Sequence, residues 1–152
     1  MNIVLVEPEI PQNTGNVART CALTRSTLHL VRPLGFSLED RYLKRAGLDY
    51  WEHVQLVEWD SFEELVQANV SARFYLATTR TDTTYEKVRY EPEDFLVFGK
   101  ETAGLPAGIL SMFPGCHIRI PMLDLGRSLN LANSVAIVLY EALRQQGYPG
   151  LS

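Results

Sequence analysis

The N-terminal stretch reads Asn2-Ile-Val-Leu-Val-Glu-Pro-Glu-Ile-Pro-Gln-Asn-Thr-Gly-Asn-Val-Ala-Arg-Thr20. Its first five residues, Asn2–Val6, form an apolar run with the length and branched side chains of a buried strand. A polar turn follows, and Gln12–Thr24 has the length of a helix. A strand that runs through a polar, glycine-containing turn into a helix is the repeating unit of α/β proteins. This stretch therefore predicts an α/β fold.

The same alternation continues along the rest of the chain. Further strands are expected at Leu28–Val31, Val54–Val57, Phe74–Ala77, Phe95–Phe98 and Ile118–Ile120. Further helices are expected at Leu38–Ala46, Phe62–Gln67, Pro106–Met112 and Leu131–Gln146. Apolar strands separated by helices indicate a mainly parallel sheet that is covered by helices on both faces. No repeat or linker interrupts the pattern, so residues 1–152 are expected to form a single domain.

The last expected helix is apolar over an unusually broad surface. Asn130 is a suitable N-cap, and Gly147 ends the segment. Its apolar stripe comprises Leu131, Val135, Val138, Leu139 and Ala142. So broad a stripe suggests burial against more than one neighbour. The second neighbour is either another part of the domain or another subunit.

The composition does not by itself suggest a nucleic-acid partner. The net charge is −4, whereas proteins that bind nucleic acid mainly through electrostatics are usually basic. If RNA is the partner, the positive charge must gather on one face or the contact must be small. No apolar run approaches the roughly 20 residues of a membrane span. The N-terminus lacks a basic leader, so we expect a cytoplasmic protein with no membrane partner.

The cysteines and histidines have no spacing typical of a metal site. The residues concerned are Cys21, Cys116, His29, His53 and His117. They are scattered along the chain, and we expect both cysteines to be reduced thiols packed as small apolar groups. No metal is expected.

Three stretches carry polar groups where α/β proteins bind ligands. In the first, Gln12, Asn16 and Arg19 fall on one face of the expected helix. A row of amides that ends in a guanidinium suits a phosphate or a ribose. The alternative is a surface helix with solvated amides.

The second stretch is Phe95-Leu-Val-Phe-Gly-Lys-Glu-Thr-Ala-Gly-Leu-Pro106. Gly99 and Gly104 would let the backbone approach a flat ligand, and Glu101 could accept hydrogen bonds from it. The alternative is a simple turn between a strand and a helix, with an exposed glutamate.

The third stretch opens the last helix with a polar cluster. Its members are Arg127, Ser128, Asn130 and Asn133. A helix N-terminus presents free N–H groups and a partial positive charge. Capping accounts for only one of these side chains, so the cluster favours a binding site.

Taken in this order, the three stretches resemble the three motifs of the SPOUT RNA methyltransferases, in the branch that methylates ribose 2′-hydroxyls. The matching residues are Pro8-Glu-Ile-Pro-Gln-Asn-Thr-Gly-Asn-Val-Ala-Arg19, Phe98-Gly-Lys-Glu-Thr-Ala-Gly104 and Arg127-Ser-Leu-Asn-Leu-Ala-Asn133. Pro33-Leu-Gly-Phe36 and Gly47-Leu-Asp-Tyr50 are similar to the small single-domain members that modify the tRNA wobble nucleotide. The resemblance spans Ile3 to Gly147.

The resemblance implies a deep trefoil knot at the C-terminal end, a homodimer and S-adenosylmethionine as the cofactor. Base rates alone would argue against a knot. The residues that the resemblance implies for the cofactor are Ala77, Gly99, Glu101, Ile120, Met122, Ser128 and Leu129.

The resemblance also implies catalytic roles for Arg19, Ser128 and Asn130, with Arg19 supplied by the other subunit. Guanidinium is a poor base, so we expect Arg19 to orient the ribose and an adjacent phosphate. The residues expected to contact the RNA are Asn13, Asn16, Arg19, Arg41, Lys44 and Arg45. The alternative for the last three is a solvated helix face.

The leading interpretation is methyl transfer to the 2′-hydroxyl of cytidine or uridine at position 34 of tRNA, in leucine isoacceptors. Three alternatives stay open: a non-catalytic knotted RNA-binding protein, a SPOUT methyltransferase acting at another RNA site, and a different nucleotide-binding α/β enzyme. Cofactor binding and labelling of tRNA separate them.

Overall fold

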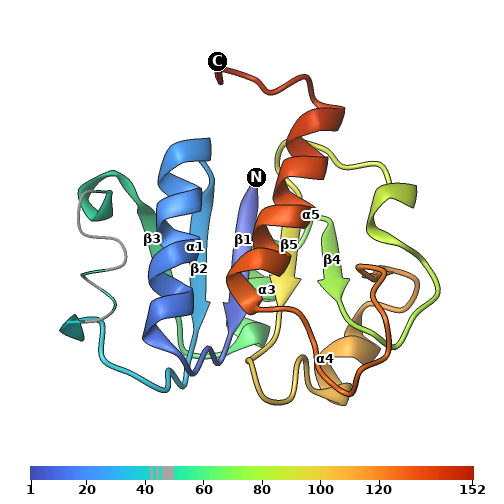
Figure 1. Ribbon diagram of the computed structural model, residues 1–152, viewed down its shortest axis with the longest axis horizontal. Coiled ribbons are helices and arrows are strands. Elements are labelled where there is room, and N and C mark those ends of the chain that lie inside the picture. The colour runs from blue at the N-terminus through green and yellow to red at the C-terminus, as the bar shows by residue number, and fades with distance from the viewer. Residues whose placement is uncertain (42, 44, 46–49) are drawn as a thin grey trace.

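Six strands form one sheet in a computed structural model, which describes residues 1–41, 43, 45 and 50–152 (Figure 1). The strand order is β3-β2-β1-β5-β4-β6, and every strand pairing is parallel. The strands are β1 (Asn2–Val6), β2 (Thr27–Val31), β3 (Gln55–Trp59), β4 (Phe74–Ala77), β5 (Phe95–Phe98) and β6 (His117–Ile118). The predicted parallel sheet is confirmed.

Helices cover both faces of this sheet. The helices are α1 (Pro11–Thr24), α3 (Phe62–Ala68), α4 (Ala107–Met112) and α5 (Leu131–Gln145), with short 3-10 turns η1 (Trp51–His53) and η2 (Tyr85–Lys87). Figure 1 shows α1 and α5 side by side on one face, with α3 and α4 behind the sheet. The helix expected at Leu38–Ala46 lies partly outside the described residues, because positions 42, 44 and 46 are not among them.

Alternation along the strands explains why both faces are covered. In β1, Ile3 and Leu5 belong to the hydrophobic cluster of α1 and α5, whereas Val4 and Val6 belong to the cluster of α3 and α4. Successive side chains of a strand point to opposite faces, so a run that is apolar at every position needs cover on both sides. The broad apolar stripe of α5 is buried in the first cluster.

The strand order places a crevice beside β1. From β1 the chain moves outward through β2 to β3, and it later returns through β4 to β5, which pairs with β1 on its other side. The connections that leave β1 and β5 therefore diverge at the carboxyl edge of the sheet. Parallel α/β proteins bind their ligands at such a point.

Strand β6 is shorter than the sequence suggested. The prediction of a strand over Ile118–Ile120 is wrong beyond Ile118, because the Arg119 N–H donates to the carbonyl of Thr83 at 2.9 Å. The chain thus leaves β4 and pairs with the segment before η2. Ile120 consequently lies in a loop rather than in a strand.

The segment between β4 and β5 contacts the C-terminal part of the chain at two places. Besides the Arg119 pairing, the side chain of Gln145 in α5 accepts from the Tyr90 N–H at 3.0 Å and donates to the Val88 carbonyl at 3.1 Å. These contacts place residues 83–90 around the end of β6 and α5. The trefoil knot itself stays a prediction.

Neither cysteine forms a disulfide, and burial raises the pKa of the Cys21 thiol to about 12. None of the helices in the described ranges is long and apolar enough to cross a membrane.

Candidate functional site

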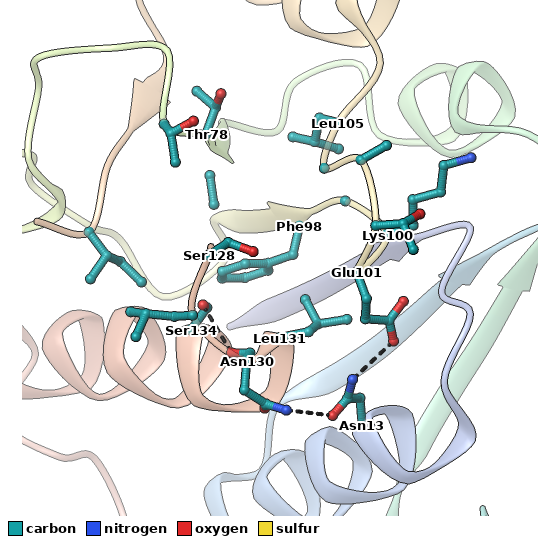
Figure 2. A pocket seen from close by; sticks show the side chains of 18 of the residues that line it. Asn13, Thr78, Phe98, Lys100, Glu101, Leu105, Ser128, Asn130, Leu131 and Ser134 are labelled. Carbon is teal, nitrogen blue, oxygen red and sulfur yellow. Dashed lines mark hydrogen bonds between the residues drawn. The ribbon is translucent and has the colours of Figure 1, made fainter. Parts of the chain in front are cut away.

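A cavity of about 480 Å³ opens at the carboxyl edge of the sheet (Figure 2). It lies where β4, β5 and β6 end and α5 begins, and its size is that of a small-molecule site. Nine residues that the sequence predicted for the site line this cavity: Asn13, Ala77, Gly99, Glu101, Ile120, Met122, Ser128, Leu129 and Asn130. Residues far apart in the sequence are therefore brought together as expected.

The Glu101 carboxylate binds the turn that precedes α1. One oxygen accepts from the Glu9 N–H at 2.8 Å, and the other accepts from the Ile10 N–H at 3.1 Å. Ile10 is the N-cap residue of α1, and neither it nor the first turn supplies an acidic or capping side chain. A carboxylate from the loop after β5 thus takes the position that suits the positive end of the helix dipole.

Asn13 joins Glu101 to the start of α5. Its side-chain N–H₂ donates to Glu101 at 3.2 Å, and its side-chain carbonyl accepts from Asn130 at 2.9 Å. The side-chain oxygen of Asn130 in turn accepts from the Asn133 N–H at 3.2 Å, so Asn130 is the N-cap of α5, as predicted. Figure 2 shows Glu101, Asn13 and Asn130 in sequence along one side of the cavity. The three polar stretches form one hydrogen-bonded unit.

Gly99 is required by the fold of the loop itself. A Cβ at this position would lie 2.0 Å from the carbonyl carbon of Gly104 and 2.2 Å from the Leu105 nitrogen. The loop folds back on itself, with Gly104 at φ +65° and its N–H donating to the backbone carbonyl of Lys100 at 2.9 Å. The sequence associated these glycines with a close ligand. The first close approach that they allow is between two parts of the loop's own backbone.

Two further contacts hold the same loop against the turn after β1. The Lys100 ammonium lies 3.3 Å from a carboxylate oxygen of Glu7, and the Thr102 hydroxyl donates to Glu9 at 2.8 Å. With Glu101, three consecutive residues of this loop bind the β1–α1 turn. This wall of the cavity is therefore rigidly built.

The exposed face of α1 carries the other predicted polar groups. Gln12, Asn16 and Arg19 are all exposed, which confirms that they share one face of the helix. Neither Asn16 nor Arg19 lines the cavity of its own chain. Arg41 and Arg45 are exposed and do not line it, and Lys44 lies outside the described residues.

The sequence missed a group of cavity residues directly after β4. Thr78, Thr79 and Arg80 line the cavity beside Ala77, and Ser134 lines it from the first turn of α5. Figure 2 shows Thr78 across the cavity from Asn13. The signal was available, because residues that follow a parallel strand reach the same edge as those that follow its neighbours.

No set of three or more histidine, cysteine, aspartate or glutamate residues could hold a metal ion within the described part of the chain.

Comparison with known proteins relates this chain to an enzyme family. Residues 1–140 match the model of the SpoU rRNA methylase family. A Bacillus subtilis relative is 50% identical over 154 residues, which cover 99% of this chain and 96% of the relative. The tRNA (cytidine(34)-2′-O)-methyltransferase of Escherichia coli K12 is 47% identical over 151 residues, with 99% and 96% covered. A solved structure from work on the 2-OH methylation of C/U34 on tRNA has a TM-score of 0.91 at 48% identity, and the match covers 96% of this chain and 95% of that one.

Proposed function

Because this chain belongs to the SpoU rRNA methylase family, we propose that it methylates the 2′-hydroxyl of the wobble cytidine or uridine, at position 34 of tRNA, with S-adenosylmethionine as the methyl donor. Its Escherichia coli relative is named for this reaction, and the two chains match over nearly their whole lengths. The observation that carries the proposal is the hydrogen-bonded unit of Glu101, Asn13 and Asn130, which unites three separate motifs in one cavity wall.

The cavity has the chemistry that this methyl donor requires. Apolar side chains of Ile120, Met122 and Leu129 suit the adenine, and the Ser128 hydroxyl and the loop at Gly99 add polar and backbone groups. With Ala77, these are the residues that would hold the cofactor, whose sulfonium supplies an already activated methyl group. The Glu101 carboxylate binds three protein N–H groups, so its part is to hold the cavity wall in place.

The remaining task of the protein is to align the ribose oxygen and to help remove its proton. Arg19 suits the first part, since its guanidinium can bind a ribose oxygen and a phosphate together. It is too weak a base to take the proton alone. Arg19 therefore acts on the ribose and the phosphate, with Asn16 on the same helix face. Ser128 and Asn130 shape the site from the start of α5.

A homodimer would complete this site. Arg19 lies outside the cavity of its own chain, so it would reach a bound cofactor in a partner chain. Helices α1 and α5 lie side by side on one face of the sheet and expose Leu23, Ile137 and Tyr140. Pairing through this face would cover these apolar side chains and carry Arg19 toward the second cavity.

Recognition of the tRNA is assigned to the dimer surface, with Arg41, Lys44 and Arg45 as its basic groups. A chain of net charge −4 needs such a local cluster to meet a polyanion. Leucine isoacceptors are the proposed substrates, and the cytoplasm is the proposed location.

The proposal is tested with purified protein, labelled S-adenosylmethionine and undermodified tRNA, followed by mapping of the labelled ribose. We expect label at position 34, and we expect Arg19→Ala to reduce transfer at least a hundredfold. Arg89→Ala is a matched control, because the Arg89 side chain is 90% exposed and does not line the cavity. RNA binding without transfer would favour the non-catalytic alternative. Failure to bind S-adenosylhomocysteine in calorimetry would favour a different nucleotide-binding enzyme.

A further inference from the structure

The Arg19 guanidinium is held against an aromatic ring. Its central carbon lies 4.7 Å from the centroid of the Tyr50 ring, and one of its terminal N–H₂ groups donates to the Tyr50 hydroxyl at 3.4 Å. Arg19 lies on the exposed face of α1, where a long side chain otherwise samples many rotamers. The ring restricts that freedom from a position 31 residues further along the chain.

The type of contact leaves the guanidinium available to a ligand. Stacking on a ring uses the flat face of the group, whereas its N–H donors point outward from its edge. Among the described residues, Tyr50 is the only hydrogen-bond partner of the Arg19 guanidinium, and it takes one of the five N–H donors. Within the described part of the chain Arg19 makes no ion pair, so no carboxylate there competes with an RNA phosphate for its charge.

Tyr50 is itself well supported. It immediately precedes η1, and its carbonyl accepts from the His53 N–H at 2.9 Å. The next residue, Trp51, packs against the hydrophobic cluster of α1 and α5. The half-buried ring therefore stands on a backbone that is tied to the same core as α1.

We propose that Tyr50 is a positioning residue for Arg19: its ring holds the guanidinium in the orientation that meets the ribose 2′-hydroxyl and the neighbouring phosphate. This inference rests on the proposed function, because it assigns Tyr50 to the same methyl transfer. The face of the Tyr50 ring positions the guanidinium. The hydrogen bond to the Tyr50 hydroxyl is long, at 3.4 Å, and contributes little to this positioning.

A double-mutant cycle tests the coupling. Single-turnover methyl transfer is measured with saturating S-adenosylmethionine for the wild type, Tyr50→Phe, Tyr50→Leu, Arg19→Ala and the double variant Arg19→Ala/Tyr50→Leu. We expect Tyr50→Leu to slow transfer about three- to tenfold, as expected for loss of a partly exposed cation–π contact. Tyr50→Phe, which keeps the ring, should stay within about twofold of the wild type. In the Arg19→Ala background, Tyr50→Leu should have no further effect.

Two controls separate this inference from folding and from the proposed function. Affinity for S-adenosylhomocysteine should be the same in all variants, and Tyr148→Leu, at an exposed tyrosine beyond α5, should transfer at the wild-type rate. Equal slowing by Tyr50→Leu with and without Arg19 would overturn the inference alone, as would wild-type transfer by Tyr50→Leu. An inactive wild-type protein would overturn the proposed function and this inference with it. If Tyr50→Leu does not fold, the rate of methyl transfer by Tyr50→Phe tests the proposal. A large loss of rate in this variant, which keeps the ring, contradicts it.

Discussion

The side-chain amide of Asn130 donates a hydrogen bond to the side-chain carbonyl of Asn13 at 2.9 Å, although 117 residues separate the two. Asn130 is the N-cap of α5, and Asn13 lies in the first turn of α1, where only 7% of its surface is exposed. The same Asn13 donates to Glu101 in the loop after β5. A single buried amide therefore links three walls of the cavity.

The first prediction concerns this amide. Asn13→Ala should destabilise the fold by about 1–3 kcal/mol, because it removes the two hydrogen bonds that join Glu101 and Asn130 to α1. It should also weaken binding of S-adenosylhomocysteine about tenfold, since the start of α5 loses its fixed position. Urea unfolding and calorimetry measure the two effects. Asn16→Ala, on the exposed face of the same helix, should change neither quantity, and equal behaviour of the two variants would contradict the prediction.

The second prediction concerns the loop after β5. Gly99→Ala should abolish detectable binding of S-adenosylhomocysteine, because the added methyl group would lie 2.0 Å from backbone and only a rearranged loop could accept it. Calorimetry against Gly108→Ala provides the comparison. A Cβ at Gly108 meets nothing within 4 Å, and alanine is favoured over glycine within a helix such as α4 by about 1 kcal/mol. Normal binding by Gly99→Ala would show that the loop is not rigid.

The third prediction concerns the pH dependence of stability. His29 is 5% exposed, its Nδ1 accepts from the Trp59 indole N–H at 3.0 Å, and its Nε2 lies 3.1 Å from the Asn2 side-chain oxygen. The ring is therefore held neutral, and burial lowers the pKa of His29 from 6.5 to about 4. Between these two values the unfolded chain binds a proton that the folded protein excludes. The free energy of unfolding should thus fall as the pH decreases through this window.

Between pH 7 and pH 5 the loss from His29 should be about 2 kcal/mol. Urea unfolding at several pH values measures it, and His29→Gln should remove that part of the slope while keeping an acceptor for Trp59. The same slope in both proteins would show that His29 is not the group responsible.

Local pattern by itself determined most of the elements of this protein. The bounds of β1, β4 and β5 agree with those expected from the sequence, and α5 begins at Leu131 behind its predicted cap. These features depend on neighbours within a few residues, such as alternation along a strand or a capping side chain before a helix. The family resemblance, carried by the three motifs, also identified nine residues of the cavity.

Contacts between distant segments were decided only by the tertiary structure. The early end of β6 depends on a carbonyl of Thr83, and the acceptor for the N-terminus of α1 comes from Glu101, more than 90 residues away. The contact between Arg19 and the Tyr50 ring likewise joins two segments that are distant in the sequence. Backbone N–H and carbonyl groups are the same at every position, so sequence does not show which of them will pair across the fold. A polar residue can be recognised from its neighbours in the chain, but its partner is chosen by the packing of the whole domain.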